Sequence, residues 1–235
     1  MLFKPNFDFL VDWADTVKAK DFASNSAFVS VFKRDNKTLV YMCDIHSHNI
    51  SFNMVDMCFA DDFGIKPDVL LTEMENTGYE RKLGWYGLQN NTLAYASAVA
   101  VKKNVHVVFA DLSDDEMIEV LKTGFPDKEI TNEELHKALK AGPTNKDGNV
   151  YNKMCDYLGH MGRDRFMLEN IAAALNKYDT VFAIFGAGHY EAQRLVLEDM
   201  MGEPEYITKI KDMRGDFSDV KIEPIKLCEF KSIGG

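Results

Sequence analysis

Short apolar runs alternate with amphipathic segments along most of this chain. Runs typical of buried strands cover residues 27–32, 39–45, 68–71, 105–110 and 180–185. Apolar residues recur at helical spacing in 7–22, 53–63, 92–103, 151–178 and 189–201. Strands that alternate with helices indicate βαβ units. The pattern therefore predicts an α/β fold, with a mixed, mainly parallel central sheet flanked by helices.

Both ends of the chain modify this picture. The first two apolar runs are separated only by the charged and turn-forming residues 34–37 (RDNK), which predicts an antiparallel N-terminal edge hairpin. Before them, Phe9, Leu10, Trp13 and Val17 define the apolar face of the expected helix 7–22. Residues 220–230 alternate weakly and are expected to add an edge strand.

Helix-start patterns cluster in the middle of the chain. Ser113 with Glu116, and Thr131 with Glu134, match the capping box that begins a helix. Residues 141–149 (AGPTNKDGN) are typical of a loop, and Gly159 and Gly162 are expected to break the long helix 151–178. We therefore expect one α/β domain over residues 1–235, with a helical, loop-rich insertion around residues 112–178.

Composition and charge narrow the classes of partner. The net charge of −10 and the pI near 5.1 disfavour nucleic acid, because an acidic surface repels phosphates. Asp8, Asp12 and Asp15 interrupt the first apolar segment, and no run of about 18 apolar residues predicts a membrane span. The four cysteines lack metal or disulfide spacing. We expect a cytoplasmic protein with reduced thiols, a small-molecule or peptide substrate, no membrane partner and possible homo-oligomers.

Four of the expected strands run directly into an ionisable residue. These residues are His46, Glu73, Asp111 and His189. In open α/β sheets, ligands bind beyond the carboxyl ends of the strands, where such side chains converge. Burying them there without a partner or ligand is costly. We therefore expect these four strand ends to form the functional site.

Two imidazoles and one carboxylate are a common ligand set for a catalytic divalent metal. His46, Glu73 and His189 are the expected ligands of an ion of the Mn, Co or Zn class, which would support metal-assisted hydrolysis. His48 either replaces one of these ligands or hydrogen-bonds to a ligand without touching the ion. Residues two apart on an extended chain, such as His46 and His48, face the same side. Asp111 either orients a ligand histidine or caps the helix that follows.

The same residues also support chemistry without a metal. His46 is then a general base activated by Glu73, with an arginine beside the oxyanion, which is esterase or lactonase chemistry. The spacing does not choose between the two mechanisms. Cys43 is a weak candidate nucleophile, because an apolar strand favours an inert buried thiol. The HExxH, GxSxG and GxxxxGK[ST] motifs are absent from the chain.

The order of these motifs resembles the Tiki/TraB superfamily, which includes erythromycin-esterase-like and haem-binding ChaN-like proteins. The hallmark of that superfamily is a pair of GxxH motifs with a glutamate between them. The matching segments are residues 43–46 (CDIH), 69–75 (VLLTEME), 107–111 (VVFAD), 162–167 (GRDRFM) and 186–189 (GAGH). Cys43 stands where the first motif has glycine, and Leu112 where an arginine is expected.

The resemblance implies three possible activities. Its Tiki branch implies a divalent-metal-dependent peptidase, its esterase branch a histidine base, and its ChaN branch haem binding through the histidines and Tyr79 or Tyr190. It also places Arg163, rather than Arg165, beside Glu73 or a substrate carboxylate. Of the two acidic residues in the VLLTEME segment, Glu73 is preferred to Glu75 because it follows the apolar run directly.

Overall fold

The structure is a computed structural model that describes residues 2–16, 28–45, 49–60, 63–75, 91–143, 148–207, 222, 224–229 and 231. The helices are η1 (Phe7–Phe9), α1 (Trp13–Thr16), α2 (Asn49–Cys58), α4 (Thr92–Lys102), α5 (Asp114–Gly124), α6 (Asn132–Ala141), α7 (Val150–Leu158), the π-helix η3 (Gly159–Arg163), α8 (Asp164–Lys177) and α9 (Ala187–Met201). The strands are β1 (Phe28–Arg34), β2 (Lys37–Asp44), β3 (Val69–Glu75), β4 (His106–Asp111), β5 (Thr180–Gly186), β6 (Glu205–Ile207) and β7 (Pro224–Ile225).

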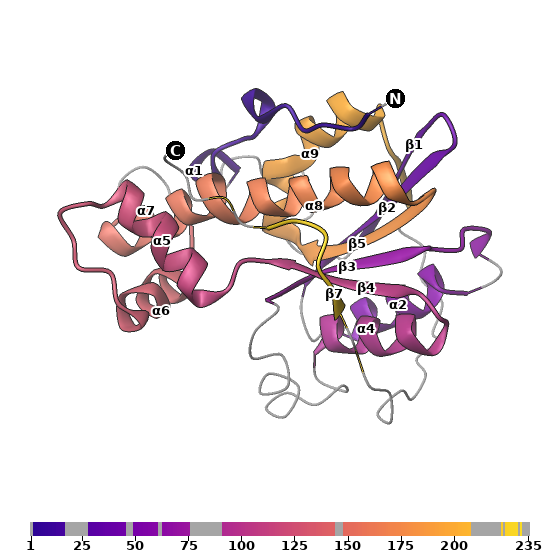
Figure 1. The fold of residues 1–235 in the computed structure, drawn as a ribbon, viewed down its shortest axis with the longest axis horizontal. Helices are drawn as coiled ribbons and strands as arrows, with labels where there is room; N and C mark the ends of the chain where they lie inside the picture. The colour runs from indigo at the N-terminus through magenta and orange to yellow at the C-terminus, as the bar shows by residue number, and fades with distance from the viewer. Residues whose placement is uncertain are drawn as a thin grey trace.

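The described strands form one seven-stranded sheet in the order β6-β1-β2-β5-β3-β4-β7. The strands β2, β5, β3, β4 and β7 run parallel, whereas β1 is antiparallel to both β2 and β6. Helices α8 and α9 cover one face of the sheet, and α2 and α4 lie against the other (Figure 1). The predicted α/β fold with its antiparallel hairpin is confirmed. The hairpin was predicted at the edge of the sheet, but β6 pairs with β1 and is the edge strand on that side.

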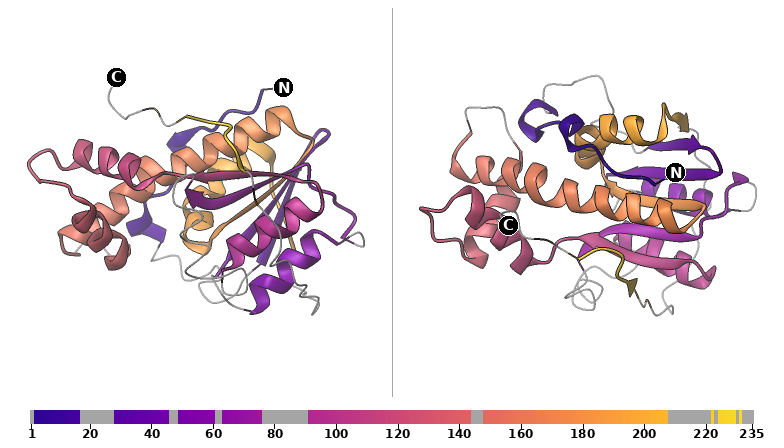
Figure 2. Two further views of the ribbon diagram at one scale, coloured as in Figure 1. Left: turned by 60° about the horizontal axis from the view of Figure 1, so that its bottom comes forward. Right: turned by 45° about the horizontal axis from the view of Figure 1, so that its top comes forward.

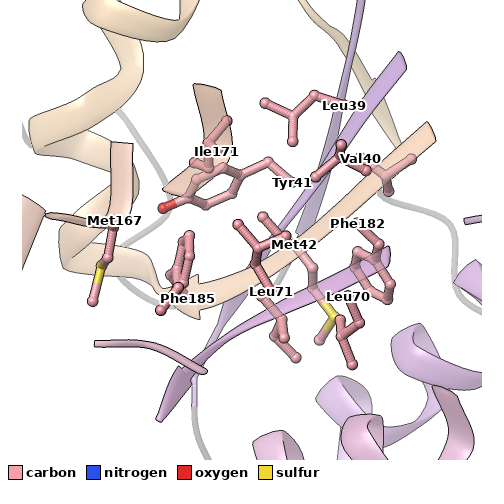
Figure 3. Close-up of a cluster of buried hydrophobic side chains, with 14 of the residues drawn as sticks. Leu39, Val40, Tyr41, Met42, Leu70, Leu71, Met167, Ile171, Phe182 and Phe185 are labelled. Atoms are coloured by element: carbon pink, nitrogen blue, oxygen red, sulfur yellow. The ribbon is translucent and has the colours of Figure 1, made fainter. Parts of the chain in front are cut away.

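The central strands are apolar on both faces because helices cover both sides of a parallel sheet. Leu39, Met42, Leu71 and Phe182 have no exposed surface (Figure 3). On the face opposite α8, the ring of Phe182 packs against Phe59, which directly follows α2. A second hydrophobic cluster lies under α5, α6 and α7, which project beyond the end of the sheet where β4 leads into α5 (Figure 2). Helices α5, α6 and α7 therefore have an apolar cluster of their own, whereas α8 packs mainly in the core of the sheet.

Several boundaries differ from the sequence prediction. Within residues 7–16, the helix expected over 7–22 is replaced by the 3-10 turn η1 followed by α1, because the Val11 N–H donates to the carbonyl of Ala192 rather than within a helix. Its remainder, residues 17–22, lies outside the described residues. Helix α2 begins and ends four to five residues before the predicted 53–63 segment. The long helix predicted over 151–178 is interrupted at the expected glycines, by a π-helical turn.

The predicted capping box at the start of α5 is present. The Ser113 hydroxyl accepts the N–H of Glu116, whose carboxylate accepts the Ser113 N–H at 2.8 Å. We expect Ser113→Ala to lower the free energy of unfolding by about 1 kcal/mol, because the Glu116 N–H loses its acceptor. Urea unfolding followed by circular dichroism measures this. Thr123→Ala in the same helix is the control, since the Thr123 hydroxyl only bonds the Glu119 carbonyl, and it should change stability little.

Candidate functional site

The structure brings Glu73, Asp111, Arg163 and His189 together at the carboxyl ends of the parallel strands. Glu73 lies near the end of β3, where the register with β4 shifts between Thr72 and Glu75. Such a bulge re-aims a side chain. Asp111 is the last residue of β4, and His189 lies in the first turn of α9 directly after β5. The ends of three different strands therefore deliver Glu73, Asp111 and His189 to one place, as the strand-end pattern predicts, and η3 adds Arg163.

Arg163 is the centre of the charge network. Its Nη2 lies 2.6 Å from Glu73 Oε1 and 2.7 Å from Asp111 Oδ2, and its Nε donates to Asp111 Oδ1 at 3.0 Å. Only 13% of its side chain is exposed. Burial disfavours the charged guanidinium, but Asp111 and Glu73 outweigh it and raise the pKa of Arg163. Arg163 therefore fixes both carboxylates in a two-pronged arrangement that lysine could not reproduce.

Glu73 is held at both oxygens. Oε1 faces Arg163 and lies 3.2 Å from Nε2 of His189, while Oε2 accepts the backbone N–H of Gly186 at 2.6 Å. Gly186 is the N-cap of α9, where unpaired N–H groups and the helix dipole favour a negative charge. The carboxylate thus has a fixed orientation toward the histidine.

His189 lies between two carboxylates. Its Nδ1 is 2.8 Å from Asp164 Oδ1 and its Nε2 faces Glu73, with only 2% of the residue exposed. Asp164 is completely buried and also accepts the side-chain N–H of Gln193 at 2.6 Å. Since Asp164 receives these donors as a carboxylate, Nδ1 of the imidazole carries a proton.

The protonation of His189 gives a testable pH dependence. Burial lowers its pKa, but Glu73 and Asp164 outweigh burial and raise it to about 9. In metal-free protein, an NMR titration should show His189 losing its second proton near that pH. Because the pKa is raised above the unfolded value near 6.5, protonation contributes on the order of 3 kcal/mol of stability below pH 6.5, which is lost as pH rises through 9. A titration midpoint near 6.5 would contradict the geometry.

Asp164 is the important residue that the sequence reasoning missed. The sequence assigned the role of orienting a histidine to Asp111, or else a helix cap. Asp111 instead binds Arg163 and its own neighbour Leu112 N–H, and Ser113 caps α5. Asp164 directly follows Arg163, so it already lay within the segment 162–167, which was singled out in the sequence for its arginine. Because the chain passes from the π-helical turn into α8 at this point, adjacent residues reach different parts of the site.

Other predicted residues fall outside this network. His46, His48 and Tyr79 lie outside the described residues, as does the side chain of Glu75. The guanidinium of Arg165 lies over the ring of Phe7 at 5.0 Å, which supports the preference for Arg163. The glycines of the GAGH segment do not have the positive φ that a sharp turn would need. His189 is instead aimed by the first turn of α9.

Cys43 and Tyr190 have structural surroundings. Burial raises the pKa of the Cys43 thiol well above its usual range, so it is an inert thiol as expected. The hydroxyl of Tyr190 accepts from Ser30 at 3.0 Å and donates to Tyr206 at 3.2 Å, and the residue has no exposed surface. Haem ligation through Tyr190 would require breaking these bonds and opening the core.

Comparisons with known proteins give no further guide to this site. No protein-family model matches the chain, and no curated protein or solved structure matches it either. Among the described residues, no group of three or more His, Cys, Asp or Glu side chains has the arrangement of a metal site. No helix within the described ranges is long and apolar enough to cross a membrane.

Proposed function

We propose that this protein is a divalent-metal-dependent hydrolase whose metal is held by Glu73 and His189. The observation that supports this is the distance of 3.2 Å between Glu73 Oε1 and His189 Nε2. Two donor atoms that each lie about 2.1 Å from one tetrahedral ion are about 3.4 Å apart. The pair therefore fits two ligands of one ion. The third ligand is His46, with His48 as its substitute, from the segment that follows β2.

The surroundings of this pair also suit a cation. A histidine that binds a metal through one ring nitrogen usually donates the N–H of the other to a carboxylate, and Asp164 supplies that carboxylate. Glu73, Asp111 and Asp164 outnumber the single guanidinium of Arg163, so the group is negative when the imidazole is neutral. An added cation would replace the second proton of His189.

Each residue of the chain has a defined task in this proposal. Asp164 keeps Nδ1 protonated, so that the Nε2 lone pair faces Glu73. Arg163 and the Gly186 N–H hold the Glu73 carboxylate in place. When bound, the ion would lower the pKa of a water molecule and polarise the bond to be cleaved. The burial of His189 and Glu73 limits bulk water around that reaction.

We propose that the substrate is a small molecule or peptide and that the bond hydrolysed is an amide bond. This follows from the resemblance of residues 43–46, 69–75, 162–167 and 186–189 to the Tiki/TraB superfamily, whose Tiki branch is peptidase-like. The ions to consider are Mn²⁺, Co²⁺ and Zn²⁺, since nitrogen and carboxylate ligands suit them.

Elemental analysis of protein purified without chelator tests the proposal. We expect about one ion of the Mn, Co or Zn class per chain in the wild type, and its loss in His46→Ala and His189→Ala. His136→Ala is a matched control, because His136 is exposed and its Nε2 lies 3.9 Å from Asp114. Metal-free wild type with full amidase activity would refute the proposal. Esterase activity that survives chelator but disappears in His46→Ala would instead favour the metal-independent mechanism.

A further inference from the structure

The N-terminal segment, residues 2–16, lies across α8 and α9 on the outer side of the fold (Figure 1). Phe3 and Asn176 exchange two hydrogen bonds, of 2.7 and 2.9 Å, and the Val11 N–H donates to the Ala192 carbonyl at 3.1 Å. Phe3, Leu10 and Trp13 are buried in the main hydrophobic core. Residues 3–13 of this segment are therefore held to α8 and α9 by both packing and hydrogen bonds.

Trp13 brings this segment into contact with the candidate site. Its indole N–H donates to Oδ2 of Asp164, and its ring meets the ring of His189 edge to face, with centroids 4.9 Å apart. The indole also lies against Gly159, where an added Cβ would sit 2.7 Å from Trp13 Cε2. A larger residue at Gly159 would displace the indole. Trp13 thus touches the histidine directly and also through Asp164.

The division of donors between the two oxygens of Asp164 gives this contact a consequence. Oδ1 receives His189 Nδ1 and Gln193 Nε2, whereas the indole of Trp13 is the donor that reaches Oδ2 within the described part of the chain. A carboxylate rotates readily about its terminal torsion. A donor on Oδ2 fixes that rotation, so Oδ1 stays directed at His189.

We propose that Trp13 is a positioning residue of the strand-end site, holding Asp164 and, through it, the ring of His189. The N-terminal segment is then a working part of the site and more than a cover for α8 and α9. The effect on metal binding rests on the function proposed above, but the effect on the orientation of His189 does not.

The test compares variants that keep the packing and remove the N–H. The chain has two tryptophans, Trp13 and Trp85, so all variants carry Trp85→Phe and differ only at position 13. That position holds tryptophan, phenylalanine, or the analogue benzothienylalanine, whose sulfur replaces the N–H in a ring of the same shape. The analogue guards against a Trp13→Phe protein that fails to fold. Leu10→Val is the matched control, since Leu10 is buried in the same segment and belongs to the same core.

Two measurements separate this inference from the proposed function. The NMR signal of the His189 Nδ1–H in metal-free protein should shift or broaden in both N–H-deficient variants and stay unchanged in Leu10→Val. The affinity for Co²⁺ alone should fall about tenfold in the same two variants. If the analogue leaves the His189 signal and the Co²⁺ affinity as in the tryptophan protein, Trp13 does not position the site. If no protein binds Co²⁺ but the signal still changes, the metal proposal fails and the positioning role stands.

Discussion

Replacing Arg163 with methionine will lower the free energy of unfolding at pH 7 by about 3–5 kcal/mol. Arg163 lies between Glu73 and Asp111, and its three contacts to them are 2.6 to 3.0 Å long. All three side chains are largely buried, with exposures of 8–13%. Removing the guanidinium leaves the carboxylate of Asp111 without its counter-charge and close to that of Glu73, which keeps His189 as a positive partner. The loss comes mainly from this unpaired charge, because methionine preserves much of the arginine's apolar stem.

Chemical unfolding of the variants at pH 7 measures this loss. Lys122→Met is the control, because Lys122 pairs with Glu119 on an exposed surface, and it should change stability by no more than about 0.5 kcal/mol. Adding Asp111→Asn to Arg163→Met should recover part of the loss, since the carboxylate that lost its counter-charge is gone. Equal effects of Arg163→Met and Lys122→Met would show that the network is solvated, unlike the one described.

Asp164 is the second position where a large effect is expected. Asp164→Ala leaves the donors of Trp13, His189 and Gln193 without an acceptor in a fully buried place. Each unpaired buried donor costs about 1–3 kcal/mol. We expect a total loss of at least about 3 kcal/mol, comparable with that of Arg163→Met. Thermal and urea unfolding measure it.

Asp164→Asn separates the support of His189 from the support of the fold. Asparagine has nearly the same size but no charge, and its amide cannot accept all three donors. We expect the affinity for Co²⁺ to fall about 10- to 100-fold, with a smaller loss of stability than in Asp164→Ala. Asp179→Asn is the control, because Asp179 is exposed and pairs with Lys37 at the surface. An Asp164→Asn protein with unchanged Co²⁺ affinity would contradict the proposed metal site.

Local features of this fold were predictable because local chemistry sets them. The turn between β1 and β2 and the capping box before α5 depend on residues within a few positions of one another. The strand-end positions of Glu73, Asp111 and His189 were also predictable, since an ionisable residue directly after a buried apolar run is visible in the sequence. The gathering of these residues followed from the rule that parallel strands end at one edge.

Which of these residues contact one another could not be predicted from the sequence and is decided by the tertiary structure. Strand β5 inserts between β2 and β3, although it comes after both in the chain, and this order decides which strand ends are neighbours. Asp111 was expected beside a histidine and lies beside Arg163, while Asp164 occupies the place beside His189. Neither partner can be read from periodicity, because an ion pair depends on where two distant segments meet.

Trp13 shows the difference most clearly. By itself, the sequence determined that Trp13 belongs to an apolar face, that His189 lies near the start of a helix after a strand, and that the fold is α/β. Only the tertiary structure decided that the helix expected from residue 7 does not begin until Trp13, and that the indole N–H of Trp13 meets Asp164. The physical reason is competition: the backbone at Val11 bonds Ala192, a donor in the same region reaches a buried carboxylate, and these long-range bonds outweigh local helix formation.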